Sequence, residues 1–335
     1  MNLRFYGDLK SVAVFWALLI SCQTLAAAAP AAEQQQQGWR LSQKIGSGDL
    51  VSVYFTSEDD GWIAGDGGYL ARTDDGGQTW TKQNINTREN INEIYFRGDD
   101  NGYILAGNKI FISKDKGATW RETLIIELSE LKGLTPEFLS VRFVNRRRGY
   151  IVGSVANRND VVVDSLVLQT NDGGESWRRI PVPTKAELFH LDFVGDDYGW
   201  IVGDGGVIIA TTDGGASWQT QVSGTDRALR NVDFRDKDNG YAVGGRGVIL
   251  RTEDGGRTWL KATTAFTESF FRVIFPDDKN GFIVGRGGVI LQTDDRGRSW
   301  VKMNGKTGEP LYGLFMAKKY GWAVGGGGVV LRYQR

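Results

Sequence analysis

Short apolar runs recur along the chain between glycine-rich and polar stretches. Seven of them consist of Gly, an aromatic residue, a short apolar stretch and a second Gly, and they begin at Gly61, Gly102, Gly149, Gly199, Gly240, Gly281 and Gly321. Each follows a run with period-two patterning that ends in Phe, at Phe55, Phe96, Phe143, Phe193, Phe234, Phe275 and Phe315. Period-two alternation and short apolar runs bounded by Gly both indicate strands. The pattern therefore predicts seven similar units of short strands.

A second motif, an octet that begins as Thr-Asp-Asp-Gly-Gly at 73–77, follows six of these runs. Its Asp and Trp are Asp75 and Trp80, Asp115 and Trp120, Asp172 and Trp177, Asp213 and Trp218, Asp254 and Trp259, and Asp295 and Trp300. An Asp that accepts backbone N–H bonds, a Gly with positive φ and a large aromatic anchor are typical of a tight turn that leads into a strand. We interpret the octets as structural turns, because six copies of a catalytic centre in one chain would be unusual.

The spacing of the octets predicts the architecture. Successive octet Trp residues lie 40, 57, 41, 41 and 41 positions apart, and a period near 41 is typical of propeller blades of four short strands. Seven aromatic strands but only six octets leave one outer strand missing. Trp39 lies 41 residues before Trp80, so Gly38–Gln43 is predicted to complete the last blade. We expect an all-β, seven-bladed β-propeller of four-stranded antiparallel blades over 38–335, closed by its N-terminal strand.

The 57-residue spacing marks an insertion at 121–138, where Leu124, Ile125, Leu128 and Leu131 have roughly helical spacing. Insertions in repeat folds lie in surface loops, often on the binding face. The same unit carries Arg146, Arg147, Arg148 and Arg158. A run of charges can simply be a solvated loop, but it is also our candidate for a partner-binding surface.

The glycine turns supply a second set of candidates. Chain topology places the turns after the second strands on one face, together with the loops that lead into the first strands, and the octet turns on the other. The glycine turns carry Asp66, Asn108, Asp204, Arg246 and Arg286, which should surround the channel mouth. They are either ordinary polar turn residues or a ligand site.

Residues 1–29 are predicted to be an export signal, because Arg4 and Lys10 flank the start of an apolar run at 11–21 that is too short to span a bilayer. Two cleavage sites compete. The segment 19–22 resembles a lipobox with Cys22 as the lipidated residue, whereas the alanines at 26–29 suit ordinary signal peptidase. Residues 30–37 are interpreted as a polar tether. We expect an exported protein of the periplasm or cell envelope, with membrane association only through a lipid anchor.

Composition narrows the function classes. Lys and Arg number 40, as do Asp and Glu, so no global basic field is available to recruit nucleic acid. Cys22 is the single cysteine and His190 the single histidine, which excludes an intramolecular disulfide, a Cys/His zinc site and a multi-histidine metal centre. We expect no metal, no cofactor and a monomeric protein.

The octets match the Asp-box pattern Ser/Thr-x-Asp-x-Gly-x-Thr/Ser-Trp. Together with the Gly-aromatic runs they resemble the photosystem II stability/assembly factor family of seven-bladed propellers, over about residues 38–335. The insertion at 121–138 departs from the regular pattern. The resemblance implies an exported, non-enzymatic, chaperone-like scaffold, whose photosynthetic members bind a newly made reaction-centre protein through an arginine-bearing surface. We therefore predict an assembly factor of the envelope whose protein partner docks on the third blade.

The alternative is a sialidase-like glycoside hydrolase or a carbohydrate-binding propeller, since those also carry Asp boxes. Such an enzyme needs an arginine trio, a Tyr nucleophile with a Glu partner and an Asp acid, and no such set is evident in the sequence. A Glu or Tyr buried in the channel beside several Arg would favour the enzyme. A flat channel mouth with an exposed basic side patch would favour the binding protein.

Overall fold

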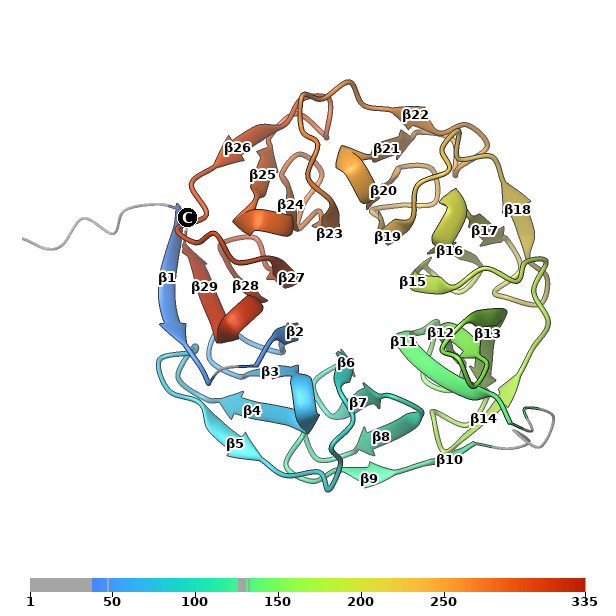
Figure 1. Cartoon of the computed structure of the whole chain (residues 1–335), viewed down its shortest axis with the longest axis horizontal. Coiled ribbons are helices and arrows are strands. Elements are labelled where there is room, and N and C mark those ends of the chain that lie inside the picture. The colour runs from blue at the N-terminus through green and yellow to red at the C-terminus, as the bar shows by residue number, and fades with distance from the viewer. Residues whose placement is uncertain (1–37, 47, 126–130, 132, 335) are drawn as a thin grey trace, which may run out of the picture. The chain divides into compact units, whose positions relative to one another are not determined.

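The Gly-aromatic runs form the second strand of each of seven sheets, and in β3 (Gly61–Gly65), β20 (Gly240–Gly244) and β24 (Gly281–Gly285) every position is buried. In the computed structural model, which describes residues 38–46, 48–125, 131 and 133–334, the sheets stand in a ring (Figure 1). The strands of each blade follow one another from the centre to the rim. The predicted seven-bladed propeller is confirmed, and no α-helix occurs in the part of the chain that the structure describes.

The strands occupy four positions in the blades. The innermost are β2 (Leu50–Phe55), β6 (Ile91–Arg97), β11 (Thr135–Phe143), β15 (Leu188–Val194), β19 (Leu229–Phe234), β23 (Phe270–Ile274) and β27 (Leu311–Met316). The other second strands are β7 (Asn101–Ala106), β12 (Gly149–Ala156), β16 (Tyr198–Gly203) and β28 (Tyr320–Gly325). The third strands are β4 (Tyr69–Thr73), β8 (Lys109–Ser113), β13 (Val162–Thr170), β17 (Ile208–Thr211), β21 (Ile249–Thr252), β25 (Ile290–Thr293) and β29 (Val329–Gln334). The outer strands are β5 (Thr81–Gln83), β9 (Arg121–Glu122), β14 (Ser176–Arg179), β18 (Gln219–Gln221), β22 (Leu260–Lys261), β26 (Val301–Met303) and, in blade seven, β1 (Gly38–Lys44).

The two faces of the ring carry different loops. On one face, which we call the glycine-turn face, short 3-10 turns join second to third strands, and the Asp66 N–H donates to the Asp49 carbonyl just before β2 (3.0 Å). These turns are η1 (Asp66–Gly68), η3 (Asp204–Gly206), η4 (Gly245–Gly247), η5 (Arg286–Gly288) and η6 (Gly326–Gly328). On the other, the Asp-box face, the Gly76 N–H of an octet donates to the Asp59 carbonyl of the loop after β2 (2.9 Å). This is the arrangement expected from the chain topology.

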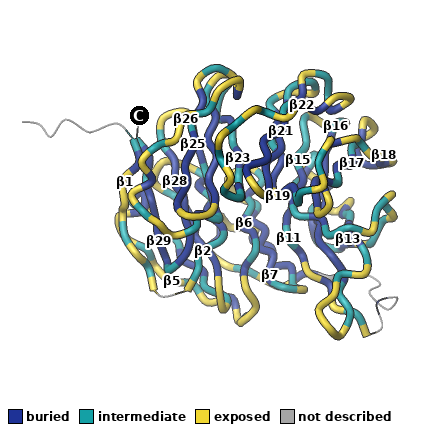
Figure 2. The backbone as a smooth tube through the Cα atoms, turned by 45° about the horizontal axis from the view of Figure 1, so that its top comes forward, coloured by how far each residue is buried: buried dark blue, intermediate teal, exposed yellow. Residues whose placement is uncertain are grey.

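Aromatic rings hold neighbouring blades together, and this packing explains the glycine before each aromatic residue. Phe55 of blade one stacks on Trp322 of blade seven at 3.4 Å between ring centroids, and Trp80 meets Phe55 edge-on at 6.1 Å. A Cβ at Gly61 would lie 2.4 Å from the Phe55 ring, so only Gly fits there. The buried positions seen in Figure 2 follow from this packing, which repeats around the ring.

Each octet forms a closed hydrogen-bonded turn. In the first, the N–H of Gly77 donates to Thr73 Oγ1 (2.9 Å), while the N–H and hydroxyl of Thr79 donate to the two oxygens of Asp75 (2.9 and 2.6 Å). The Thr79 hydroxyl and N–H bonds lower the pKa of Asp75 to about 2. Both carboxylate oxygens are therefore used inside the turn itself, as our structural interpretation of the octets requires.

The ring closes as predicted. Strand β1 pairs antiparallel with β29, with Trp39 opposite Tyr333, and it extends one residue beyond the predicted range, to Lys44. Trp39 is 4% exposed and packs edge-on against Phe282 of blade six at 6.2 Å. A strand from one end of the domain thus completes a blade whose other three strands come from the opposite end.

The insertion begins as extended chain, so Leu124 and Ile125 lie in a strand and not in the helix that their spacing favoured, whereas Leu131 lies in a 3-10 turn. Arg121–Glu122 is the outer strand of blade two. Strand β10 (Leu124–Ile125) then runs parallel to β14 as a fifth strand of blade three. Residues 126–130 and 132, which include Leu128, lie outside the described residues. Pairing with a free sheet edge satisfied the backbone where the side-chain spacing alone favoured a helix.

Blade seven departs from the predicted pattern at its innermost strand. Met316 pairs with Gly321 as Phe55 pairs with Gly61 in blade one, and Phe315 pairs with Trp322 instead. Our assignment of Phe315 as the equivalent strand end was therefore wrong by one position. The reason is that four residues separate the paired Met316 and Gly321, whereas five separate Phe55 and Gly61.

Candidate functional site

Every innermost strand has a β-bulge at the same position, and the bulges shape the mouth of the central channel. In β2 the pairing with β3 shifts between Leu50 and Ser52, which leaves Val51 as the extra residue. The same shift occurs in all seven blades. The seven bulged residues, which we call the collar, are Val51, Asn92, Leu139, Phe189, Arg230, Phe271 and Tyr312. None of them is buried, and bulges commonly re-aim side chains next to functional sites.

Arg230 and its neighbours give the collar an aromatic and cationic side. The Arg230 guanidinium lies 4.0 Å from the Phe189 ring centroid, and Phe271 packs against Tyr312 at 5.4 Å. A guanidinium over an aromatic ring is held by cation–π attraction. The mouth therefore presents flat apolar surfaces beside an exposed positive charge.

The residues after the bulges differ in chemistry from blade to blade and connect neighbouring blades. They are Ser52, Glu93, Ser140, His190, Asn231, Arg272 and Gly313. Ser52 Oγ accepts the Ile94 N–H (2.9 Å), Glu93 Oε2 accepts the Val141 N–H (2.6 Å), and Asn231 Oδ1 accepts the Val273 N–H (3.0 Å). Each bond joins one blade to the next.

A second ring of side chains lies two residues further along each innermost strand and also connects neighbouring blades. It consists of Tyr54, Tyr95, Arg142, Asp192, Asp233, Ile274 and Phe315. Asp192 Oδ2 accepts the Phe234 N–H (2.7 Å) and Asp233 Oδ2 accepts the Phe275 N–H (3.0 Å). Our sequence analysis missed both rings because it described these strands only by their period-two pattern and their terminal Phe. Aligning the seven units on the Gly-aromatic run would have shown that Glu93, His190 and Arg272 occupy equivalent positions in their units.

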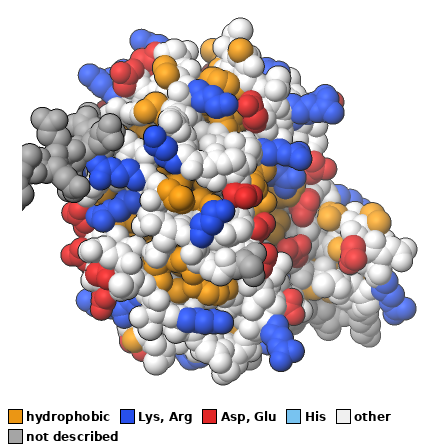
Figure 3. Space-filling model, turned by 60° about the vertical axis from the view of Figure 1, so that its left-hand side comes forward, with side chains coloured by type: hydrophobic (Ala, Val, Ile, Leu, Met, Phe, Trp, Pro, Cys, Tyr) orange, Lys and Arg blue, Asp and Glu red, His pale blue; other side chains and the backbone are white. Residues whose placement is uncertain are grey.

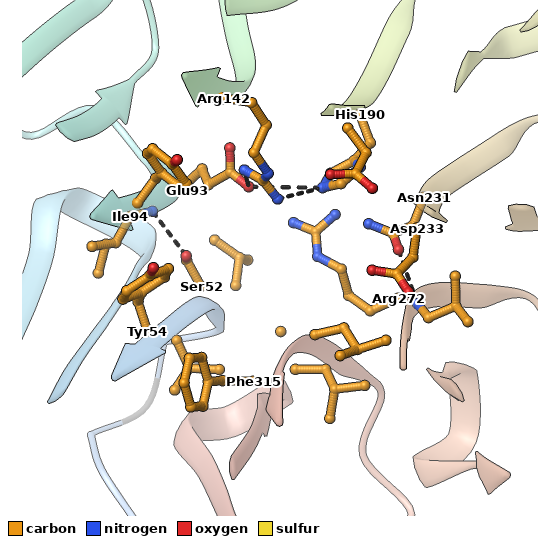
Figure 4. Close-up of a pocket in the computed structure, with 18 of the residues that line it drawn as sticks. Ser52, Tyr54, Glu93, Ile94, Arg142, His190, Asn231, Asp233, Arg272 and Phe315 are labelled. Carbon is orange, nitrogen blue, oxygen red and sulfur yellow. Dashed lines mark hydrogen bonds and ion pairs between the residues drawn. The ribbon is translucent and has the colours of Figure 1, made fainter. Parts of the chain in front are cut away.

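Arg142 is the centre of a buried charged cluster (Figure 4). One of its terminal nitrogens donates to Glu93 Oε1 (2.9 Å) and the other to His190 Nε2 (2.8 Å). Burial, followed by the charges of Arg142 and Arg272, holds the pKa of His190 well below its usual value. Burial alone would lower the pKa of Arg142, but Glu93 and Asp192 outweigh it and raise that pKa. His190 is therefore neutral, and its Nε2 accepts a hydrogen bond from a permanent cation.

Two aspartates in the same channel have raised pKa values. Burial raises the pKa of Asp192 to about 6. Burial and the nearby Asp192 carboxylate raise the pKa of Asp233 to about 8. Two carboxylates that share an apolar environment cannot both ionise easily, so Asp233 keeps its proton at neutral pH.

The channel meets our criterion for an enzyme in composition but not in geometry. Glu93, Tyr54 and Tyr95 line it together with Arg142 and Arg272. However, the Tyr54 hydroxyl donates to the Phe96 carbonyl (2.9 Å), and burial raises the pKa of Tyr54 rather than lowering it, as a nucleophile would need. Both oxygens of Glu93 are engaged, by Arg142 and the Val141 N–H. Two arginines, not three, reach the channel among the described residues.

The blade-three arginines lie at two ends of the blade. Arg146, Arg147 and Arg148 precede β12 on the Asp-box face, whereas Arg158 follows β12 on the glycine-turn face. Eight residues of strand separate the two sites by roughly 26 Å, at about 3.3 Å per residue. The four arginines therefore do not form one surface, which corrects the grouping that we made from the sequence.

The arginine triplet adjoins a groove between blades three and four. Arg146 and Arg147 are exposed, and Arg148 donates to the Asp196 carbonyl of blade four (2.9 Å). The groove has a volume of about 380 Å³ and is lined by Arg148, Arg178, Asn171, Ile180, Pro181 and Trp218 together with neighbouring backbone. Its lining combines positive charge with apolar surface.

The glycine-turn candidates lie where expected, at exposed positions of the second-to-third turns. They are Asp66, Asn108, Asp204, Arg246 and Arg286. Asp66 Oδ2 accepts the Asp49 N–H (3.1 Å), a capping contact within the turn region. In the space-filling view, which brings the left-hand side of Figure 1 forward, Lys and Arg are interspersed with Asp and Glu (Figure 3). The Asp66 contact is that of an ordinary polar turn residue.

The described residues contain no group of three or more His, Cys, Asp or Glu side chains placed to hold a metal ion. They also include no helix with the length and apolar character that a membrane span needs. The proposed signal at 1–29, Cys22 and the tether at 30–37 lie outside the described residues.

Comparison with known proteins gives a consistent picture. The family described as "Photosynthesis system II assembly factor YCF48" matches residues 31–132, 127–223 and 216–312. The photosystem II stability/assembly factor HCF136 of Oryza sativa subsp. japonica is 32% identical over 65 residues, which are 19% of this chain and 16% of that protein. The match thus spans less than a fifth of the relative's length.

Two solved structures resemble the whole propeller. "YCF48 bound to D1 peptide" superposes with a TM-score of 0.71 at 20% identity over 89% of this chain and 97% of that one. A virginiamycin B lyase from Staphylococcus aureus superposes with a TM-score of 0.70 at 10% identity over 89% and 99%. An assembly factor and a lyase share this fold, so the fold by itself does not decide the activity.

Proposed function

Because the chain belongs to the family of the photosynthesis system II assembly factor YCF48, we propose that it is a non-catalytic assembly factor that binds a protein partner through blade three. The observation that carries this proposal is the groove between blades three and four, beside the exposed Arg146 and Arg147. Cationic side chains steer an acidic partner and fix its orientation, while apolar lining supplies contact area.

The fifth strand of blade three supports the same site. Strand β10 pairs with β14, whereas the outer strands of the other blades have no such cover in the described chain. The unit that differs from its neighbours therefore also lines this groove. A partner that must recognise one blade among seven similar ones needs features that the repeat does not share.

We place the protein in the periplasm or cell envelope as part of this proposal. The basis is the basic and apolar segment at 1–29, with Cys22 as the residue that would carry a lipid anchor. The partner would then be a membrane or envelope protein, and the propeller would act as a monomer.

The test is capture of a partner from the envelope fraction by the tagged protein. Arg146→Glu with Arg147→Glu should abolish capture, because it reverses two exposed charges beside the groove. The matched control is Lys318→Glu with Lys319→Glu, two exposed charges in the corresponding loop of blade seven. Exposed substitutions usually change stability by less than about 0.5 kcal/mol, so circular dichroism should show both variants folded. Equal capture by all three proteins would refute docking on blade three.

A glycoside hydrolase is the second candidate, because Glu93, two tyrosines and two arginines meet in the channel. The raised pKa of Tyr54 and the full engagement of Glu93 argue against it. Turnover of a fluorogenic sialoside by the wild type, lost in Glu93→Gln while folding is retained, would favour the enzyme and overturn the non-catalytic proposal.

A further inference from the structure

The two arginines that line the channel differ in their contacts. Arg142 donates to a carboxylate, to an imidazole and to the Val141 carbonyl, and lies over the Tyr95 ring. Arg272 forms no hydrogen bond or ion pair with any described residue, and its guanidinium points into the open middle of the channel (Figure 4). Its pKa is lowered by burial, and Glu93 only partly offsets this. Arg272 is half-buried, and a cation that is partly removed from water without a close partner is costly, so this side chain would gain from a bound anion.

The space in front of Arg272 has a polar and an apolar side. The cavity measures about 180 Å³, below the roughly 300 Å³ of sites for drug-sized ligands. Blades two to six contribute charged and polar groups, including Glu93 and Asn231. Blades six, seven and one contribute apolar groups, including Ile274, Leu314 and Val51. An occupant that matches both sides is small, with one polar end and one apolar end.

The surrounding charges limit that polar end to a single negative charge. Glu93 and Asp192 line the same cavity, and their carboxylates would repel a dianion such as phosphate. A carboxylate carries one delocalised charge on two oxygens, which fit the planar fork of a guanidinium. We propose that the channel binds a small monocarboxylic acid, with its carboxylate paired to Arg272 and its apolar part on Ile274 and Leu314.

This site is separate from the partner surface of blade three, so its test does not depend on the proposed function. Benzoate is the probe, titrated calorimetrically into the wild-type protein. Benzamide has the same shape without charge, and N-acetylalanine presents the carboxylate of a chain terminus. Benzoate or N-acetylalanine should bind. The higher affinity of the two indicates whether the carboxylate comes from a free small acid or from a chain terminus. Benzamide and phosphate at equal ionic strength should bind at least about tenfold more weakly, because the charged hydrogen bonds are lost or the second charge is repelled.

Arg272→Gln should weaken binding of the acid by about tenfold or more, whereas Arg298→Gln, at an exposed arginine of the same blade on the Asp-box face, should not. If Arg272→Gln fails to fold, Ile274→Trp provides the second variant, since it fills the apolar side of the cavity without removing the cation. An anomalous difference map of wild-type crystals soaked in 4-bromobenzoate should place the bromine on that side. Equal binding of benzoate and benzamide, stronger binding of phosphate, unchanged affinity in Arg272→Gln, or bromine found only outside the channel would overturn the proposal.

Discussion

The closing strand β1 should contribute as much stability as any internal outer strand, and Trp39→Ala tests this. Trp39 is 4% exposed and contacts Phe282 at 6.2 Å and Tyr333 at 5.3 Å, rings that belong to two different blades. Truncation of a buried Trp costs about 3–5 kcal/mol, and each favourable aromatic pair adds about 0.5–1.5 kcal/mol to simple burial. We therefore expect Trp39→Ala to lower the free energy of unfolding by an amount in the upper half of the range of about 3–5 kcal/mol.

The control lies two residues away on the same strand. Leu41 is 46% exposed, so Leu41→Ala should change stability by less than about 0.5 kcal/mol. Both variants should be compared with the wild type by urea unfolding, followed by far-UV circular dichroism because the mutation removes a fluorophore. An unchanged slope with a lower midpoint would indicate a pure loss of stability. If the free energies of unfolding of Trp39→Ala and Leu41→Ala differ by less than about 0.5 kcal/mol, the packing of β1 does not stabilise the closed ring. Our reasoning would then be refuted.

Two further predictions concern the inter-blade packing and the channel. Gly240→Ala should lower the free energy of unfolding by about 1–3 kcal/mol, because the new Cβ would lie 2.4 Å from the Phe234 ring. The control Gly308→Ala should be nearly neutral, because no atom lies within 4 Å of its new Cβ. Equal melting temperatures of the two variants would contradict the packing argument. The pKa of Asp233 is raised to about 8, whereas that of an unfolded Asp is about 4. The contribution of Asp233 to stability is therefore fully present below about pH 4 and is lost as the pH rises through 8. The loss is at most about 1.4 kcal/mol per pH unit. Asp233→Asn keeps an acceptor for the Phe275 N–H and cannot ionise, so its melting temperature should fall less than that of the wild type between pH 5 and 9; parallel pH profiles would show that Asp233 ionises normally.

The sequence determined the repeat, because its signals are local. Gly61 and its equivalents are required by the ring that covers them, and the Asp75 octet closes on its own hydrogen bonds, so each unit is specified within about 41 residues. Even the closing strand could be predicted, since Trp39 keeps the register of the Trp series. The sequence also marked blade three as the irregular unit, through its longer spacing and its arginines.

The tertiary structure decided which distant residues meet. Arg158 and Arg148 are ten positions apart in sequence but lie at opposite ends of β12, while Glu93, Arg142 and His190, nearly fifty positions apart from one to the next, form one cluster. Ring closure brings seven equivalent positions to a common axis, and the bulge in each innermost strand turns them toward the channel. No local pattern encodes that convergence, because each of these side chains finds its partner only on the next blade.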